Sequence, residues 1–383
     1  MADLNETPRA NRIHIAFFGL RNAGKSTLVN AFTGQPIAIV SDVAGTTTDP
    51  VSKAMEILPL GPCLVTDTAG LDDEGELGAM RVEKTLKVLA TTDIAVWVWG
   101  SGASPLQEEE AVSNKAAGRR FPEFVETCRK RNVPVIEYRR GDSVEELKQK
   151  IAAVKLEDAA PGLLDGLVEK GDRVLCVVPI DESAPKGRLI LPQQQVIREC
   201  LDQGAVVTVC GPEDVRRETE DVKRAPNLVV TDSQAFGKVK GCCAGLRLTS
   251  FSVLFARQKG DLGAFAKGLE AIKGLKDGDR VLVAEGCTHH RQCNDIGSVK
   301  IPKALEKLSG KKLNFEFSSG GGFPDSVIRL FGYSVIVHCG GCMLTRREML
   351  RRIELAKAAG IPIVNYGLVL AKAGGLKVED LLI

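Results

Sequence analysis

Short apolar segments of strand length alternate with longer amphipathic segments along most of the chain. In the first part of the chain these apolar segments are Ile13–Gly19, Leu64–Asp67 and Asp93–Trp99. The segments between them have the pattern of amphipathic helices that bury one face. This alternation is typical of a doubly wound α/β sheet. We therefore expect residues 1–158 to form one α/β domain.

The same alternation begins again after a stretch that runs from Leu156 to Asp172, which we interpret as a linker. The strands expected beyond it are Val174–Ile180, Ala205–Cys210, Asn227–Thr231 and Leu246–Arg257, with a helix near Gln194–Asp202. A third series has expected strands at Arg280–Ala284, Leu313–Phe317, Tyr333–His338 and Ile361–Asn365. The predicted fold class is therefore α/β throughout, and the first domain is followed by two smaller α/β domains with mainly parallel sheets, at residues 170–260 and 261–383.

The composition and charge indicate the compartment and the classes of partner. Hydrophobic residues make up 44% and charged residues 26% of the 383 residues, as in ordinary globular proteins. The formal net charge of +2 gives no indication of a nucleic-acid or membrane partner. The polar amino terminus lacks the apolar core of a signal peptide, and eleven cysteines without such a signal indicate a reducing compartment. We expect a cytoplasmic protein.

The segment from Gly19 to Ser26 matches the phosphate-binding pattern G-x-x-x-x-G-K-[ST], between an apolar strand and a helix. Glycines let backbone N–H groups curl around a β-phosphate, and the helix N-terminus adds partial positive charge. Lys25 is expected to reach the β- and γ-phosphates, and the Ser26 hydroxyl to bind Mg²⁺. The nucleotide-binding residues expected in this loop are Gly19, Asn22, Ala23, Gly24, Lys25, Ser26 and Thr27.

Two further motifs follow in the order expected of a GTPase. Asp67-Thr-Ala-Gly70 ends a strand as a D-x-x-G element. It would place Asp67 near the Mg²⁺ and the N–H group of Gly70 toward the γ-phosphate. Between the phosphate loop and that strand, Gly45-Thr-Thr-Thr-Asp49 offers a threonine to the metal ion. Together the three motifs predict a GTPase.

This set of motifs resembles the tRNA-modification and ribosome-assembly branch of GTPases, the TrmE/Era-like group. In that branch a G-T-T-R-D element carries the switch threonine, which corresponds to Thr47, and Thr48 replaces the arginine. The resemblance implies that Asn22 coordinates a K⁺ ion, while Leu71 stands where Ras-like enzymes carry a water-orienting glutamine. It implies a K⁺-stimulated GTPase, with Mg²⁺ held by Ser26 and Thr47, and with the catalytic residues Lys25, Thr47, Asp67 and Gly70.

The N-K-x-D motif that reads guanine in GTPases is not intact in this chain. Asn114-Lys115-Ala116-Ala117 keeps its first two letters but has no aspartate. Arg139-Arg140-Gly141-Asp142 follows the expected strand Val133–Tyr138 and keeps only the aspartate. That strand is either the fifth of the domain or the sixth, because Val144–Ile151 has the pattern of a closing helix. Both registers stay open, and Asp142 is the candidate residue for reading the base.

A second candidate site combines cysteines and histidines after two expected parallel strands. Cys287 and His289 form a C-x-H motif after one strand, and His338, Cys339 and Cys342 form an H-C-x-x-C motif at the end of another. The carboxyl ends of parallel strands share the sheet edge at which α/β proteins build their sites. Spacing alone is equally compatible with a structural Cys₃His zinc site and with a 4Fe–4S cluster that keeps one iron exchangeable.

The order of these domains and motifs is similar to that of the FeFe-hydrogenase maturation GTPases, the HydF family, over nearly the whole chain. The stretches Val178–Gly187 and Leu248–Arg257 also resemble that family. The resemblance implies a 4Fe–4S cluster whose ligands are Cys287, Cys339, Cys342 and, as a labile fourth ligand, His289 or His338.

The same resemblance implies a function. The protein would be a GTP-hydrolysing scaffold or carrier in assembly of the diiron cofactor (H-cluster) of FeFe-hydrogenase. It would receive a transient 2Fe precursor from two radical-SAM maturases and deliver it to apo-hydrogenase, and it would be a homodimer through its middle domain. One alternative is an RNA-modification or ribosome-assembly GTPase with a structural zinc site, against which the near-neutral charge argues. Another is a non-enzymatic iron–sulfur carrier with a decayed nucleotide domain, which the broken base-reading motif favours and the intact phosphate loop opposes.

Overall fold

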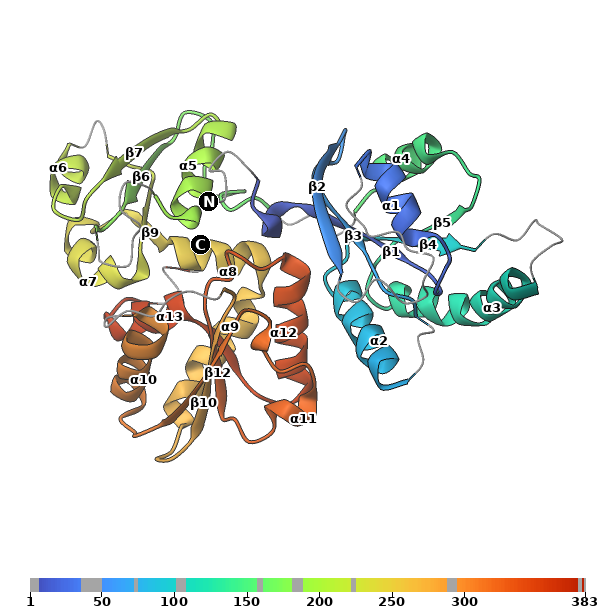
Figure 1. The fold of residues 1–383 in the computed structure, drawn as a ribbon. Coiled ribbons are helices and arrows are strands. Elements are labelled where there is room, and N and C mark those ends of the chain that lie inside the picture. Colours follow the sequence, from blue (N-terminus) through green and yellow to red (C-terminus); the bar gives the residue numbers. More distant parts are fainter. Residues whose placement is uncertain are drawn as a thin grey trace. The chain divides into compact units, whose positions relative to one another are not determined.

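The computed structural model describes residues 7–35, 50–71, 75–100, 108–156, 161–180, 189–221, 225–287, 295–377 and 381. The chain divides into two compact units, Met1–Ala159 and Ala160–Ile383. Strands and helices alternate in both units, which confirms the α/β class (Figure 1). No helix in the described ranges has the length and apolar character needed to cross a membrane.

The described part of the first unit is built on a five-stranded sheet in the order β2-β3-β1-β4-β5. Its strands are β1 (Ile13–Phe18), β2 (Val51–Ile57), β3 (Gly61–Asp67), β4 (Ile94–Trp99) and β5 (Val135–Arg139). Neighbouring strands pair in parallel except β2, which runs antiparallel to β3. The helices of this unit are η1 (Arg9–Asn11, 3₁₀), α1 (Lys25–Thr33), α2 (Gly75–Leu89), α3 (Glu108–Arg129) and α4 (Val144–Ala152).

The central strand β1 is buried on both faces. Ile15 and Phe17 pack into a core with residues of α1 and α4, and Phe18 packs on the other face against Phe124 of α3, with ring centroids 5.0 Å apart. A parallel strand covered by helices on both faces is expected to be apolar throughout, as β1 is. This packing fixes the carboxyl end of β1, where the phosphate loop begins.

The structure places the two candidate guanine-reading segments in different elements. The backbone of residues 114–117 lies inside α3, so the Asn114-Lys115 register does not follow a strand, as the N-K-x-D motif requires. β5 pairs directly with β4, and α4 packs against α1. The strand before Asp142 therefore occupies the position next to β4, and the helix after it closes the described part of the unit.

The second unit contains two four-stranded parallel sheets. The first has the order β7-β6-β8-β9 and the second the order β11-β10-β12-β13. The strands of the first are β6 (Arg173–Val177), β7 (Val206–Cys210), β8 (Leu228–Thr231) and β9 (Arg247–Ser250). Those of the second are β10 (Arg280–Glu285), β11 (Asn314–Ser319), β12 (Val335–His338) and β13 (Ile363–Asn365).

Helices cover both sheets of the second unit (Figure 1). The α-helices are α5 (Leu191–Asp202), α6 (Val215–Glu220), α7 (Phe236–Val239), α8 (Phe251–Lys259), α9 (Leu262–Ala271), α10 (Ile301–Ser309), α11 (Val327–Leu330), α12 (Arg346–Ala358) and α13 (Tyr366–Ala373). Shorter turns are η2 (Ser233–Ala235), η3 (Lys240–Cys242), η4 (Ile272–Gly274), η5 (Ile296–Lys300, a π-helix) and η6 (Gly320–Gly322).

The expected strand Leu246–Arg257 is wrong in its second half. The strand ends at Ser250, whose hydroxyl accepts a hydrogen bond from the N–H group of Val253 and so begins helix α8. A serine at this position satisfies an N–H group that the first helical turn leaves without a partner. The apolar run of Leu246–Arg257 thus belongs to a strand and a helix that are both buried.

Helix α8 belongs to the cores of both sheets of the second unit. Its Phe251, Leu254 and Phe255 pack with residues of the first sheet, whereas Val253 and Ala256 pack with residues of the second. It contacts α5 and β9 as well as α12, α13 and β13. A change at this helix therefore acts on both halves of the second unit.

Candidate nucleotide and metal sites

The phosphate loop has the backbone shape that its glycines permit. A Cβ atom on Gly19 would lie 2.5 Å from the carbonyl oxygen of Val98, so a side chain does not fit there. Gly24, with φ of 88°, is the N-cap of α1, and Asn22 has φ of 59°. These left-handed conformations turn the chain from the end of β1 into the helix N-terminus, where backbone N–H groups can meet an anion.

Lys25, Ser26 and Asp67 come together beneath this loop. The buried Lys25 ammonium donates to the carbonyl oxygen of Leu20 at 2.7 Å. The Ser26 hydroxyl donates to Oδ2 of Asp67 at 2.6 Å, and Oδ1 of this fully buried carboxylate has no hydrogen-bond partner among the described residues. Burial raises the pKa of Asp67, although the Ser26 hydroxyl and the Lys25 charge act in the opposite direction. A partly buried hydroxyl and a carboxylate with an oxygen to spare fit a Mg²⁺ ion that also binds phosphate oxygens.

The D-x-x-G motif is attached to the phosphate loop. Thr68 donates its hydroxyl to the carbonyl oxygen of Phe17 at 2.7 Å, and the N–H group of Leu71 donates to the carbonyl oxygen of Gly19 at 3.3 Å. Gly70 therefore lies beside the loop. Thr47 lies outside the described residues, and Ala23 is buried whereas the side chains of Asn22 and Thr27 are exposed.

Asp142 lies in the turn after β5. Its Oδ2 accepts a hydrogen bond from the N–H group of Arg139 at 2.8 Å, and its carbonyl oxygen accepts one from the Tyr138 hydroxyl at 3.0 Å. The carboxylate is thus held at the carboxyl end of β5, on an exposed residue. The Asn114-Lys115 pair does not share this position.

The cysteines of the second candidate site lie at the carboxyl ends of β10 and β12. These strands are neighbours, and the N–H group of Cys339 donates to the carbonyl oxygen of Ala284 at 2.9 Å. Burial raises the pKa of Cys287 to about 11 and that of Cys339 to about 12, with a further rise from the other site thiols. The pKa of Cys342 is also raised by burial. The N–H group of Gly286, the residue before Cys287, donates to the sulfur of Cys339, so the two cysteine segments meet at this edge of the sheet.

Backbone N–H groups and glycines shape the loop that carries Cys339 and Cys342. The sulfur of Cys339 accepts hydrogen bonds from the N–H groups of Gly286 at 3.1 Å and Gly341 at 3.4 Å. Gly341 has φ of 68°, and a Cβ there would lie 2.4 Å from Cε of Met349. N–H groups directed at a cysteine sulfur stabilise its thiolate form, which is the form that binds a metal.

The three cysteines fit a thiolate-bound metal or an iron–sulfur cluster, although the described residues do not supply a complete set of ligands. Among these residues no three His, Cys, Asp or Glu side chains form a group that could already hold a metal ion. His289 falls in 288–294, outside the described residues. Three thiols with N–H groups directed at one sulfur suit iron–sulfur ligation, in which cysteine thiolates are the usual ligands.

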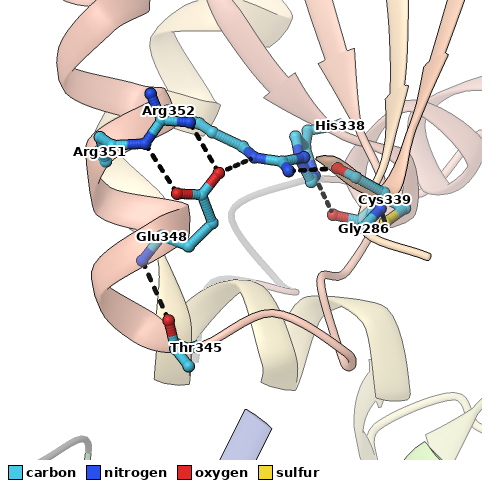
Figure 2. A network of polar contacts seen from close by, with 8 residues as sticks. Gly286, His338, Cys339, Thr345, Glu348, Arg351 and Arg352 are labelled. Atoms are coloured by element: carbon cyan, nitrogen blue, oxygen red, sulfur yellow. Dashed lines mark hydrogen bonds and ion pairs between the residues drawn. The ribbon is translucent and has the colours of Figure 1, made fainter. Parts of the chain in front are cut away.

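His338 is engaged away from the thiols (Figure 2). It is fully buried; Nε2 lies 3.0 Å from Nη1 of Arg352, and Nδ1 lies 2.9 Å from the carbonyl oxygen of Cys339. Because an arginine can only donate, Nε2 must accept and Nδ1–H must donate to Cys339. Burial and the Arg352 charge lower the pKa of His338 to about 3. Both ring nitrogens already have partners, so this histidine is poorly placed to bind a metal.

Arg352 and Glu348 of α12 hold His338 in this orientation (Figure 2). Nε of the buried Arg352 donates to Glu348 at 2.8 Å, and its Nη2 donates to the carbonyl oxygen of Gly320 at 2.7 Å. Burial raises the pKa of Glu348, but its ion pairs with Arg351 and Arg352 outweigh burial and leave that pKa lowered. Sequence reasoning missed this network, since an arginine on an amphipathic helix gives no sign that it is buried.

Lys259, at the end of α8, is a second residue that sequence reasoning missed. Its ammonium group is buried and donates to the carbonyl oxygens of Leu344 at 2.7 Å, Cys342 at 3.0 Å and Gly341 at 3.5 Å. Burial lowers the pKa of Lys259 to about 8, whereas negative charge on Cys342 or Cys339 would raise it. The one available signal was a lysine at the end of an apolar segment.

Comparison with known proteins assigns the three parts of the chain. A model of the hydrogen maturase F dimerization domain matches residues 163–260, and one of the hydrogen maturase F tetramerization domain matches residues 263–380. A model described as a 50S ribosome-binding GTPase matches residues 14–129. The two maturase models together span more than half of the chain.

Individual relatives match shorter stretches of the chain. The tRNA modification GTPase MnmE of Endomicrobium trichonymphae is 38% identical over 95 residues, which are 24% of this chain and 21% of that protein. The GTPase Der of Campylobacter hominis is 35% identical over 108 residues, 28% of this chain and 23% of that protein. The chain thus covers less than a quarter of the length of these relatives.

Among solved structures, Era in complex with MgGDPNP and a segment of 16S ribosomal RNA is 16% identical, with a TM-score of 0.27, over 92% of this chain and 99% of that one. That likeness is too weak to bear on function. The three matched domains carry the assignment: this chain belongs to the hydrogen maturase F (HydF) family, and its first unit contains a GTPase domain of the TrmE/Era-like group.

Proposed function

We propose that this protein is a GTP-binding and GTP-hydrolysing scaffold or carrier in assembly of the diiron H-cluster of FeFe-hydrogenase, and that it binds a 4Fe–4S cluster. The observation that carries the proposal is that two cysteine segments meet at the carboxyl ends of β10 and β12, where the N–H group of Gly286, the residue before Cys287, donates to the sulfur of Cys339. They lie in a domain of the hydrogen maturase F type, in a chain that also has a complete phosphate loop.

The proposed cluster ligands are Cys287, Cys339 and Cys342, with His289 as the labile fourth ligand. His289 is favoured over His338 because both ring nitrogens of His338 already make hydrogen bonds. Bound there, a 4Fe–4S cluster would supply one-electron chemistry and an iron position able to exchange a ligand. The chain's own residues partly bury the three cysteines and direct N–H groups of Gly286 and Gly341 at the sulfur of Cys339.

The nucleotide site would work through positioning and charge. Lys25 would leave its carbonyl partners to reach the β- and γ-phosphates of GTP, and Ser26 would turn from Asp67 to Mg²⁺. Thr47 would complete the Mg²⁺ coordination, and the N–H group of Gly70 would meet the γ-phosphate. A K⁺ ion at Asn22 would supply the positive charge that other GTPases obtain from an arginine.

The remaining parts of the proposal concern partners. We assign residues 1–158 to the GTPase domain, 170–260 to a dimerisation domain and 261–383 to the cluster-binding domain of a cytoplasmic homodimer. The partners would be two radical-SAM maturases, which supply a 2Fe precursor as cargo, and apo-hydrogenase, which receives it. The descriptions of the two maturase models support an oligomer. In this scheme the GTPase controls partner exchange and does no chemistry on the cluster.

Two variants test whether cluster binding resides in the second unit and GTP hydrolysis in the first. Cys339→Ser should lose the iron–sulfur absorption and fail to mature hydrogenase, yet hydrolyse GTP at the native rate, because Lys25 and Ser26 lie in the other unit. Lys25→Ala should lose GTP hydrolysis by 100-fold or more, on the order of what removal of one charge-stabilising group costs, and keep the cluster. Cys243→Ser is the matched control, since this buried thiol lies in a different core cluster. A native cluster spectrum in Cys339→Ser would refute the ligand assignment.

A further inference from the structure

Helix α8 lies close to the Cys339–Cys342 loop at two points. A Cβ atom on Gly340 would lie 3.2 Å from the hydroxyl oxygen of Ser252, near the start of the helix. At the end of the helix, Lys259 donates three hydrogen bonds to the carbonyl oxygens of Gly341, Cys342 and Leu344. The helix lies in the stretch matched by the dimerization-domain model, and the loop lies in the one matched by the tetramerization-domain model.

The three acceptors define the charge of Lys259. A neutral amine has two N–H donors, whereas an ammonium has three, so three carbonyl partners select the ammonium form. These partners are backbone carbonyls, and the ammonium also lies over the ring of Phe255, 5.4 Å from its centroid. A buried cation is costly unless an anion compensates it. The cysteines whose charge acts on Lys259 are Cys342 and Cys339, which become thiolates when they bind a metal.

We propose that Lys259 is a positioning residue of the cluster site, which clamps the cysteine loop from α8 and raises the reduction potential of the bound cluster. This inference rests on the proposed 4Fe–4S cluster. One-electron reduction adds a negative charge to a cluster held by thiolates, and a fixed cation nearby stabilises the reduced form more than the oxidised form.

The test compares four variants of the full-length chain, purified without oxygen and reconstituted with iron and sulfide. Dithionite supplies the electron, and the midpoint potential is read from the EPR signal of the reduced cluster. Lys259→Met removes the charge and the donors, Lys259→Gln keeps two donors without charge, and Lys259→Arg keeps the charge. Lys273→Met, which removes an exposed lysine paired with Glu270, is the matched control.

Lys259→Gln and Lys259→Met should have lower midpoint potentials than the native protein, while Lys259→Arg and Lys273→Met stay close to the native value. Loss of iron from folded Lys259→Met, with iron kept in Lys259→Arg, would equally support a charged clamp. Full iron content with a native potential in Lys259→Gln would overturn the inference, as would loss of iron from all three Lys259 variants with the fold intact by circular dichroism. Absence of iron from the native protein would instead refute the proposed function.

Discussion

Asn22 adopts a left-handed backbone conformation at the tip of the phosphate loop, with φ of 59° and an exposed side chain. Asparagine tolerates this conformation better than most residues, so its presence could serve the turn alone. The proposed role in K⁺ binding needs the side-chain oxygen as well. Glycine accepts the same backbone conformation and lacks that oxygen, and it therefore separates the two roles.

GTP hydrolysis by the native protein should be faster in K⁺ than in Na⁺ at equal ionic strength, and Asn22→Gly should abolish the difference. Alanine would be a poorer choice, since it adds about 1 kcal/mol of backbone strain. Asn132→Gly is the control, because Asn132 also has a positive φ, of 50°, on a different loop of the same unit. Steady-state phosphate release in the two salts measures the effect. Equal rates for the native protein would exclude the K⁺ role.

Asp142, in the turn after β5, is the candidate residue for reading the guanine base. An aspartate there would accept hydrogen bonds from guanine, and adenine would leave its desolvated carboxylate without a partner, at a cost of about 1–3 kcal/mol. Asp142→Asn should therefore lower the preference for GTP over ATP by roughly 5- to 100-fold. Glu145→Gln, which changes an exposed carboxylate three residues away, should leave it unchanged. Competition of labelled GTP with excess ATP decides, and an unaltered preference in Asp142→Asn would show that other residues read the base.

Strand β7 is an edge strand that could join two copies of the chain. It lies at the end of the order β7-β6-β8-β9, with Val206 and Val209 49% and 44% exposed. The N–H group of Val206 donates to Asp172 on the β6 side, so by the alternation of a strand that of Val209 faces outward. An open edge with exposed apolar residues readily pairs with another strand. We expect this edge to be the dimer contact.

Val209→Pro should weaken the dimer, because it removes an outward N–H group without removing a hydrogen bond to β6. The control is Ile328→Lys, a charged substitution at an exposed apolar position of α11, whose Leu330 packs in the core of the other sheet of the second unit. Sedimentation velocity should give a native dimer, a control dimer and a largely monomeric Val209→Pro. A stable Val209→Pro dimer with native secondary structure would place the contact elsewhere.

The elements also show what the sequence could and could not predict. Strands such as β1 and β10 were predictable because uninterrupted apolar runs of strand length are typical of buried parallel strands. The run Leu246–Arg257 failed for the same reason, since a buried strand followed by a buried helix looks like one long strand unless the capping role of Ser250 is recognised. The cysteine motif was visible locally. The contact of Lys259 with Leu344 and that of Arg352 with Gly320 join residues 85 and 32 positions apart, and no local pattern encodes them.

For the whole molecule, the central claim is that one chain joins a GTPase site in its first unit to an iron–sulfur site in its second. The two sites share no residue, and each is built at the carboxyl ends of parallel strands in its own unit. Family membership supports the pairing of a GTPase with hydrogenase maturation. The iron–sulfur hypothesis and the zinc alternative differ in the metal that the second unit binds.

The most direct test is the metal content and EPR spectrum of the native protein, purified without oxygen. A brown protein with close to four irons per chain, little zinc, and an EPR signal that appears on reduction is the expected result. Cys339→Ser should lack that signal, because a thiolate ligand is gone. A colourless protein that holds one zinc per chain and gives no EPR signal would contradict the iron–sulfur site and favour the GTPase with a structural zinc.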